Sequence, residues 1–206
     1  MPRPSANQDK QARREAILEA TRSVLAEKGY SKTSMLEVAR RASASKETLY
    51  AWFGDKQGLF EALVLSNTEE IHQALHAKIA EAGPNPKTVI TAFAHALQKL
   101  LLGERALVVN RAAIAEAGRD AALGQLIGSQ GRQQILPDLI DYLETQKAEG
   151  RLSFEVAEEA VDTLFGLAIG DRQVRRLLGS LPMPTEAAIT LRAKRSAERF
   201  MVLYGP

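Results

Sequence analysis

The stretch GYSKTSMLEVARRASASKETLYAWFGDKQGLF, residues 29–60, has the pattern of two short helices separated by a tight break. Ser34 and Glu37 stand at the spacing of a capping box, which predicts a first helix of about two turns. Beyond the break, Ser45 is a good N-cap for a second helix, which ends at Gly54. Two short helices in this order are typical of a helix-turn-helix.

The second helix has one inward and one outward face. Leu49 and Phe53 lie four residues apart on one side of a helical wheel, so we expect them to point into a core. The opposite side carries Glu47, Thr48, Tyr50 and Ala51, and its flanks carry Lys46 and Trp52. A short helix with a polar and aromatic outer face and a cationic entry is shaped to lie in a major groove of DNA.

The remaining sequence is helical throughout, with no segment of strand-like alternation. Further helices are expected at residues 10–28, 56–80, 87–102, 104–117, 120–149, 154–178 and 185–204. Pro137 interrupts one of them and would free a backbone carbonyl there. The Gly- and Pro-rich segment 82–86 is a clear break between helices. The fold class is therefore all-α, with about nine helices.

Composition excludes several classes of protein. The 206 residues contain no cysteine, which removes disulfides, thiol catalysis and cysteine-based zinc sites. No window approaches 18 uninterrupted apolar residues, and the polar, basic N-terminus has no apolar signal segment. We therefore expect no membrane association and a cytoplasmic location.

Charge is unevenly distributed along the chain. The first 60 residues hold 11 Lys and Arg against 7 Asp and Glu, whereas the rest hold 16 against 18. A basic N-terminal part is a weak indication of a polyanion-binding module, because helical proteins also carry charge for solubility alone. The N-terminal arm, with Arg3, Lys10, Arg13 and Arg14, could add DNA contacts or have no role.

Residues 29–60 closely resemble the DNA-binding signature of TetR/AcrR-type transcriptional regulators. The matching positions are Gly29-Tyr30, Thr33-Ser34, Val38-Ala39, Ser45-Lys46, Thr48-Leu49-Tyr50, Phe53, Lys56 and Leu59-Phe60. The segment from Phe165 to Gly179 also resembles the C-terminal domain of an AefR-like branch. The resemblance implies a three-helix helix-turn-helix domain at residues 1–56, joined to a larger helical domain for effector binding and dimerisation at residues 57–206.

The resemblance also implies which residues bind DNA. They are Thr33, Ser45, Lys46, Glu47, Thr48, Tyr50, Trp52 and Lys56. Thr33 and Lys56 occupy positions that contact the DNA backbone, and the others occupy positions that meet bases and phosphates. Two alternatives stay open, because Lys56 could be an ordinary solvated lysine and Trp52 could merely cover the first helix.

Two positions depart from the usual family pattern. Many members have glycine where this chain has Ser43, in the turn, and a serine at positive φ costs on the order of 1 kcal/mol. Many also have glycine where this chain has Glu47. A carboxylate in the groove needs a donor such as cytosine N4, so Glu47 is either a specificity residue or simply faces solvent.

The last two predicted helices carry apolar and small residues suited to helix packing. The predicted dimer interface consists of Leu164, Gly166, Leu167, Gly170, Ile189, Ala193, Ala197 and Phe200. The two glycines also fit plain intramolecular packing. The resemblance favours a homodimer in which these helices form a four-helix bundle with their symmetry mates.

Sensing would require a cavity among the middle helices. Its candidate residues are Phe93, His95, Leu97, Asn110, Arg111, Ile114, Leu139 and Tyr142, although most apolar members of this set would serve equally well as core. An apolar lining with few polar groups indicates a small hydrophobic or amphipathic effector.

Nothing in the sequence indicates an enzyme, a cofactor or a metal site. No nucleophile elbow or phosphate-binding loop is present. His72 and His76 have a spacing that can bind metal, with Glu69 nearby, but no matching third ligand is evident and exposed surface histidines are expected.

The expected function is a homodimeric, sequence-specific regulator of transcription. Its partners would be double-stranded DNA with a near-palindromic operator and a small effector that releases the repressor. The alternatives are a transcriptional activator with the same fold, or a helical module that binds protein. Salt dependence separates the last from DNA binding.

Overall fold

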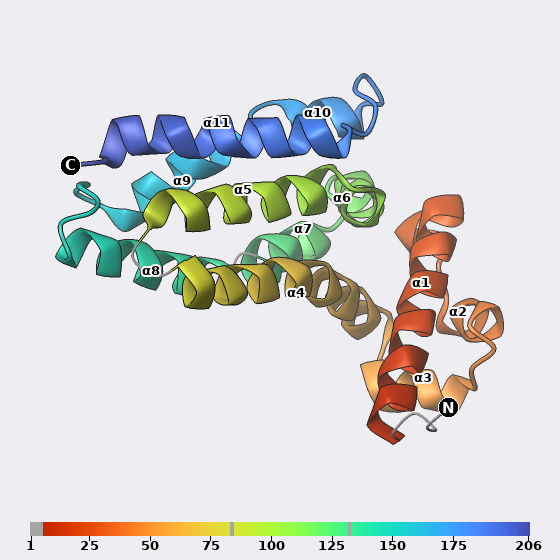
Figure 1. The fold of residues 1–206 in the computed structure, drawn as a ribbon. Helices are drawn as coiled ribbons and strands as arrows, with labels where there is room; N and C mark the ends of the chain where they lie inside the picture. The colour runs from red at the N-terminus through yellow and green to blue at the C-terminus, as the bar shows by residue number, and fades with distance from the viewer. Residues whose placement is uncertain (1–5, 83–84, 132) are drawn as a thin grey trace. The chain divides into compact units, whose positions relative to one another are not determined.

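The computed structural model describes residues 6–82, 85–131 and 133–206. The described residues form eleven α-helices and one π-helical turn, without a strand (Figure 1). The helices are α1 Ala6–Lys32, α2 Met35–Arg41, α3 Lys46–Phe53, α4 Lys56–Ala82, α5 Pro86–Leu102, α6 Glu104–Glu116, α7 Ala122–Leu126, α8 Leu136–Ala148, α9 Ala157–Ala168, α10 Arg172–Leu177 and α11 Glu186–Tyr204; the π-helical turn is Ile127–Gly131. The predicted all-α fold is confirmed.

The chain divides into two compact units. Unit 1 comprises Met1–Leu65 and Val108–Gly128, and unit 2 comprises Ser66–Leu107 and Ser129–Pro206. Helices α4 and α6 each contribute residues to both units. The expected division into a DNA-binding domain, residues 1–56, and a domain for effector binding and dimerisation, residues 57–206, stays a prediction.

Unit 1 is built around α1, α2, α3 and the first part of α4. Its core contains Ile17, Leu18, Val24, Leu25, Met35, Val38, Leu49, Phe53, Leu59, Phe60 and Leu63, with residues of α6 and α7. Leu49 is fully buried and Phe53 is 7% exposed. The predicted inward face of the second short helix is therefore confirmed.

Side-chain caps and a glycine mark the helix boundaries in unit 1. The hydroxyl of Ser34 accepts a hydrogen bond from the Glu37 amide, and a carboxylate oxygen of Asp55 accepts one from the Gly58 amide. The regular part of α1 ends at Gly29, which has φ 73° and ψ 172°. These local contacts satisfy backbone groups that a helix end leaves without partners.

Ser43 has φ 49°, and it is the one non-glycine residue with positive φ in the described part of the chain. The Arg13 side chain donates a hydrogen bond to its carbonyl oxygen at 2.6 Å. The expected positive φ in this turn is therefore confirmed.

Unit 2 packs α5 against α9, α10 and α11, and α8 against α9. Its core takes apolar residues from α4, α5, α8, α9 and α11. A buried polar residue, Gln98, donates to the carbonyl oxygens of Ala94 and Ile189 at 3.0 and 3.4 Å. Arg176 joins α10 to the end of α5 by donating to the Leu102 carbonyl oxygen at 3.0 Å.

Two long helices expected from the sequence are each divided. The segment 120–149 contains α7, the π-helical turn and α8, and Pro137 lies in the first turn of α8. Proline is tolerated there because the first amides of a helix have no intrahelical acceptor. The prediction that Pro137 would free a backbone carbonyl was therefore wrong. The segment 154–178 is divided at Gly170, whose φ is 56°. Within the predicted break at 82–86, residues 83 and 84 lie outside the described residues, as does Arg3 of the basic arm.

No helix in the described part of the chain is long and apolar enough to span a membrane.

Candidate nucleic-acid interface

Helix α3 has a buried face and an exposed face. Lys46, Glu47 and Ala51 are exposed, and Tyr50 is 45% exposed. Because Leu49 anchors the other face in the core, the orientation of these outer side chains is set by the packing of unit 1. The exposed face offers an ammonium, a carboxylate and a phenol within about two helical turns.

Ser45 fixes the start of α3. Its hydroxyl oxygen accepts a hydrogen bond from the Thr48 amide at 3.1 Å and lies 2.9 Å from the Thr48 hydroxyl oxygen. The backbone N–H of Glu47 and the Ser45 hydroxyl lower the pKa of the exposed Glu47 carboxyl. Glu47 therefore presents a negative charge at the entry of α3.

Two cations lie over aromatic rings in this region. The Lys46 ammonium nitrogen is 5.4 Å from the centroid of the Tyr50 ring, along the outer face of α3. The Arg14 guanidinium of α1 is 5.7 Å from the centroid of the Phe53 ring. Such contacts hold a charged group near an apolar surface while leaving its N–H donors available.

A hollow of about 460 Å³ runs between α1 and α3. It is lined by Lys10, Gln11, Arg14, Ala51 and Trp52. Trp52 is half-buried and packs edge-to-face on Phe53, with ring centroids 6.4 Å apart. Trp52 therefore supports the core and also borders a hollow that contains two basic side chains.

Lys56, in the first turn of α4, is held against the end of α1. Its ammonium nitrogen donates to the Tyr30 carbonyl oxygen at 3.1 Å and lies 4.2 Å from the centroid of the Tyr30 ring. Tyr30 in turn packs edge-to-face on Phe60, and burial raises the pKa of its phenol. An ammonium group has three N–H donors, so the bond to Tyr30 does not exhaust the capacity of Lys56.

Thr33 is placed differently from the other predicted residues. Its side chain is buried, and its hydroxyl donates to the Gly29 carbonyl oxygen at 2.8 Å. The hydroxyl therefore satisfies a carbonyl at the end of the regular part of α1. This hydroxyl donor is already used inside unit 1, and the assignment of Thr33 to a DNA-backbone contact stays a prediction.

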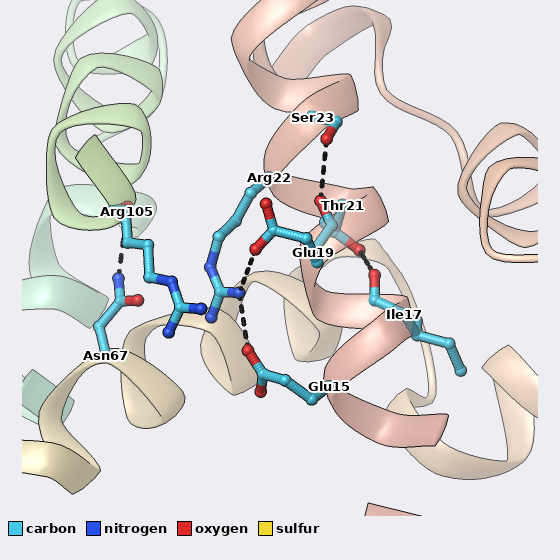
Figure 2. A network of polar contacts seen from close by, with 8 residues as sticks. All are labelled: Glu15, Ile17, Glu19, Thr21, Arg22, Ser23, Asn67 and Arg105. Atoms are coloured by element: carbon cyan, nitrogen blue, oxygen red, sulfur yellow. Dashed lines mark hydrogen bonds and ion pairs between the residues drawn. The ribbon is translucent and has the colours of Figure 1, made fainter. Parts of the chain in front are cut away.

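Ion pairs connect side chains within α1 and between α1 and α2. Figure 2 shows the buried Arg22 side chain of α1 donating to the carboxylates of Glu15 and Glu19 at 2.9 and 3.0 Å. On α2, Arg41 pairs with Glu27 of α1, which lowers the pKa of the Glu27 carboxyl. The exposed pair contributes little energy, but it fixes the direction of two long side chains.

Both parts of the chain match described families. Residues 17–63 match bacterial regulatory proteins of the tetR family, and residues 88–206, more than half of the chain, match the C-terminal domain of AefR-like transcriptional repressors. The chain belongs to the TetR family. It is a DNA-binding transcriptional regulator of the AefR-like branch, and the predicted family is confirmed.

Relatives of this TetR-family regulator align over nearly its whole length. A TetR transcriptional regulator from Agrobacterium tumefaciens is 34% identical, with a TM-score of 0.73 and 94% of each chain covered. A protein of Mesorhizobium loti assigned to the same family is 25% identical, with a TM-score of 0.77 and coverage of 95% of this chain and 98% of that one. The transcriptional regulator AlkX of Mycobacterium tuberculosis is 25% identical in an alignment of 193 residues, which covers 89% of this chain and 82% of AlkX.

The predicted effector residues are divided between the two compact units. Phe93, Leu97, Leu139 and Tyr142 lie together in the core of unit 2. His95 is on the same helix as Phe93, but it pairs with Glu186 of α11 at 2.7 Å. The remaining three, Asn110, Arg111 and Ile114, belong to unit 1, and Ile114 is 61% exposed. The prediction that Ile114 lines an effector cavity is therefore corrected, because an exposed side chain does not line an enclosed cavity.

Two buried polar atoms in unit 2 have no hydrogen-bond partner among the described residues. The first is the hydroxyl of Tyr142, whose side chain is 6% exposed and whose pKa is raised by burial. The second is the amide oxygen of Asn67, whose nitrogen donates to the Arg105 carbonyl oxygen at 3.5 Å (Figure 2). Asn67 borders a pocket of about 160 Å³ that also contains Lys99, Glu104 and Arg105, a site that the sequence analysis missed.

Most predicted dimer residues are used inside the single chain. Leu164, Ala193, Ala197 and Phe200 are fully buried in the core of unit 2, and Ile189 is 1% exposed. They cannot contact a second copy without unpacking that core, so their assignment to an interface is corrected. Leu167 is half-buried, and Gly166 and Gly170 are exposed.

The pair His72 and His76 has a partner that the sequence did not reveal. The Asp138 carboxylate of α8 lies 3.0 Å from the His72 Nε2 and 2.8 Å from the His76 Nε2. Asp138 is thus a third potential ligand that was not evident from the sequence, and both histidine side chains are partly exposed, as expected.

Proposed function

We propose that this TetR-family regulator is a homodimeric repressor, released from a near-palindromic operator by a small hydrophobic effector. The observation that carries the proposal is the two-sided helix α3. Leu49 and Phe53 lock one face into the core, while Lys46, Glu47 and Tyr50 are exposed on the other. A helix held in this way can enter a major groove without rearrangement of unit 1.

The exposed groups of α3 suit two kinds of DNA contact. Lys46 and Glu47, at the helix entry, can donate to guanine and accept from cytosine N4, so they would set base preference. Thr48 and Tyr50 would add contacts to bases or sugar-phosphate. Ser45 would act mainly by capping α3.

Phosphate contacts would come from the groups that surround α3. Lys56 is held next to α1 with donor capacity remaining, and Lys10 and Arg14 line the hollow beside Trp52. Contacts with phosphates fix orientation and supply affinity for any sequence. Lys56 and Trp52 would each have two roles. Each packs inside unit 1, and each would also contact DNA.

Dimerisation would use the outer faces of α9 and α11. Val202 is 85% exposed and Leu191 is 49% exposed on α11. A Cβ placed on the exposed Gly166 of α9 would meet no heavy atom within 4 Å, so this surface is open to another backbone. The exposed charges are complementary: α9 carries Glu158, Glu159 and Asp162, and α11 carries Lys194, Arg195 and Arg199. A two-fold axis can place α9 of one copy against α11 of the other.

Effector binding would use the core of unit 2 around Tyr142. A buried hydroxyl without a partner costs about 1–3 kcal/mol, and an acceptor on a bound ligand would remove that cost. Phe93, Leu97 and Leu139 are at most 1% exposed, so the effector would have to displace side chains from a closed core. This requirement favours an apolar molecule with one hydrogen-bonding group.

Release of DNA would follow from the extent of α4. This single helix, Lys56–Ala82, starts beside the recognition helix and ends within unit 2. An effector that shifts its second half would change the separation of the two α3 helices in a dimer. Two recognition helices must match half-sites about 34–36 Å apart, so a small shift is enough to prevent specific binding.

Binding to an arbitrary duplex at several salt concentrations tests this function without a known operator. Wild type should bind at low ionic strength, and the logarithm of its association constant should fall linearly with the logarithm of salt concentration. The double variant Lys56→Ala, Arg14→Ala should show a shallower slope. Protein that ignores every duplex at low salt would overturn the proposal.

A further inference from the structure

Three possible metal ligands meet on the surface of unit 2. His72 and His76 lie one turn apart on α4, and Asp138 lies in the first turn of α8. The Nε2 atoms of both imidazoles approach the same carboxylate oxygen, at 3.0 and 2.8 Å, and are 3.2 Å from each other. Within the described ranges these residues form the one cluster of three or more such side chains that could hold an ion.

The separations of the three donor atoms fit the coordination of a metal ion. Bonds of about 2.1 Å place neighbouring ligand atoms about 3.0 Å apart in octahedral geometry and about 3.4 Å apart in tetrahedral geometry. The observed separations of 2.8, 3.0 and 3.2 Å are close to these values. An ion about 2.1 Å from each atom would sit roughly 1 Å outside their plane, with its other positions unfilled by these residues.

The surroundings indicate which ion fits. The side chains of His72, His76 and Asp138 are 39%, 52% and 32% exposed, so water can complete the coordination. Two imidazoles and one carboxylate favour zinc, nickel, cobalt or copper over calcium and magnesium, which prefer oxygen ligands. Glu69, one helical turn before His72, is engaged elsewhere, because its carboxylate accepts a hydrogen bond from the Gln73 side chain at 2.7 Å.

We propose that His72, His76 and Asp138 bind one divalent transition-metal ion. The ion would replace the hydrogen bonds between the histidines and Asp138 with three coordinate bonds. It would thereby tie the second half of α4 to the start of α8. Binding of this ion requires neither DNA nor an effector, so the site stands or fails independently of the proposed function.

Cobalt titration of the untagged full-length protein tests the site, since polyhistidine tags bind the same ions. Wild type should bind one Co²⁺ per chain, with visible absorption bands that report direct ligation. Zn²⁺ should displace the cobalt, and a large excess of Mg²⁺ should not. The variants His76→Ala and Asp138→Asn should each bind at least about tenfold more weakly.

Two matched variants control for indirect effects. His95→Ala removes the third histidine of the chain, which pairs with Glu186, and Asp141→Asn removes an exposed carboxylate from the same helix as Asp138. Both should bind cobalt like wild type. The proposal fails if wild type gives no cobalt bands, or if His76→Ala and Asp138→Asn retain wild-type affinity. In the second case the ion is bound at other residues.

Discussion

Arg13 of α1 donates a hydrogen bond to the carbonyl oxygen of Ser43, thirty residues further along the chain and in the turn before α3. This contact holds a serine at φ 49°, a conformation that favours glycine. The turn between α2 and α3 is therefore under local backbone strain, supported by a side chain from the first helix.

Replacing this serine by glycine should stabilise the protein. Ser43→Gly removes the penalty of a side chain at positive φ, and we expect the free energy of unfolding to rise by about 0.5–1 kcal/mol. The control is Ala42→Gly, in the same turn but at φ −80°, which should lower stability by a similar amount. Urea denaturation measures the free energy of unfolding of both variants. A lower value for Ser43→Gly than for wild type would contradict the claim that Ser43 is strained.

Tyr142 and Tyr204 form a matched pair for testing the unpartnered hydroxyl. Tyr142→Phe removes a buried hydroxyl without a partner, so stability should stay level or rise by about 1 kcal/mol. Tyr204→Phe removes a hydroxyl that lies 2.9 Å from the Thr163 hydroxyl and should cost about 1 kcal/mol. Thermal unfolding of both variants decides the matter. Equal losses would mean that Tyr142 has a partner in solution.

Stability should also fall in alkaline solution. Burial raises the pKa values of Tyr30 and Tyr142 above the ordinary value of 10.0, so the folded state holds these protons more tightly than the unfolded state. Stability is then fully present below pH 10 and decreases as pH rises through the folded-state pKa values. Tyr142→Phe should flatten this decrease. A variant with the same alkaline slope as wild type would contradict the assignment.

Substitutions on the outer face of α3 should have two different effects on DNA binding. One should lower the affinity for every duplex, and the others should change the base preference. Tyr50→Ala should weaken binding to all duplexes, whereas Lys46→Ala and Glu47→Ala should change which base is preferred at one position of each half-site, by about 1–3 kcal/mol. All three side chains are exposed, so the melting temperature should change little. Binding to single-base variants of the selected site measures this. If all three variants lost affinity equally for every duplex, α3 would not recognise bases.

Oligomeric state should depend on exposed residues of α11 rather than on its apolar stripe. Val202→Asp with Leu191→Asp should convert a dimer into a monomer that keeps its helical content. Leu36→Glu, on an exposed position of α2, is the control and should leave the assembly unchanged. Sedimentation measures the mass. A dimer that survives the double substitution would place the interface on another surface.

Local sequence signals predicted the helix-turn-helix well because they act within a few residues. Ser34, Ser45 and Asp55 cap the helices that follow them, and Gly54 ends α3 at φ 73°. Each contact spans at most four residues, so its outcome depends little on the rest of the fold.

Signals that depend on distant residues were harder to interpret. The apolar stripe of α11 correctly predicted burial, but a stripe does not reveal whether its own chain or a second copy covers it. Ala197 and Phe200 turned out to be packed in the core of their own unit. Likewise, Asp138 lies 62 residues from His76, and only the packing of α4 with α8 brings their side chains together.

In the proposed complex, paired α3 helices enter successive major grooves of one duplex. Selection of bound duplexes from a random pool, with wild-type protein at moderate salt, tests this claim most directly. We expect a near-palindrome whose half-site centres lie about 10 base pairs, or a multiple of that, apart. Recovery of single asymmetric sites, or of no enriched sequence, would contradict it.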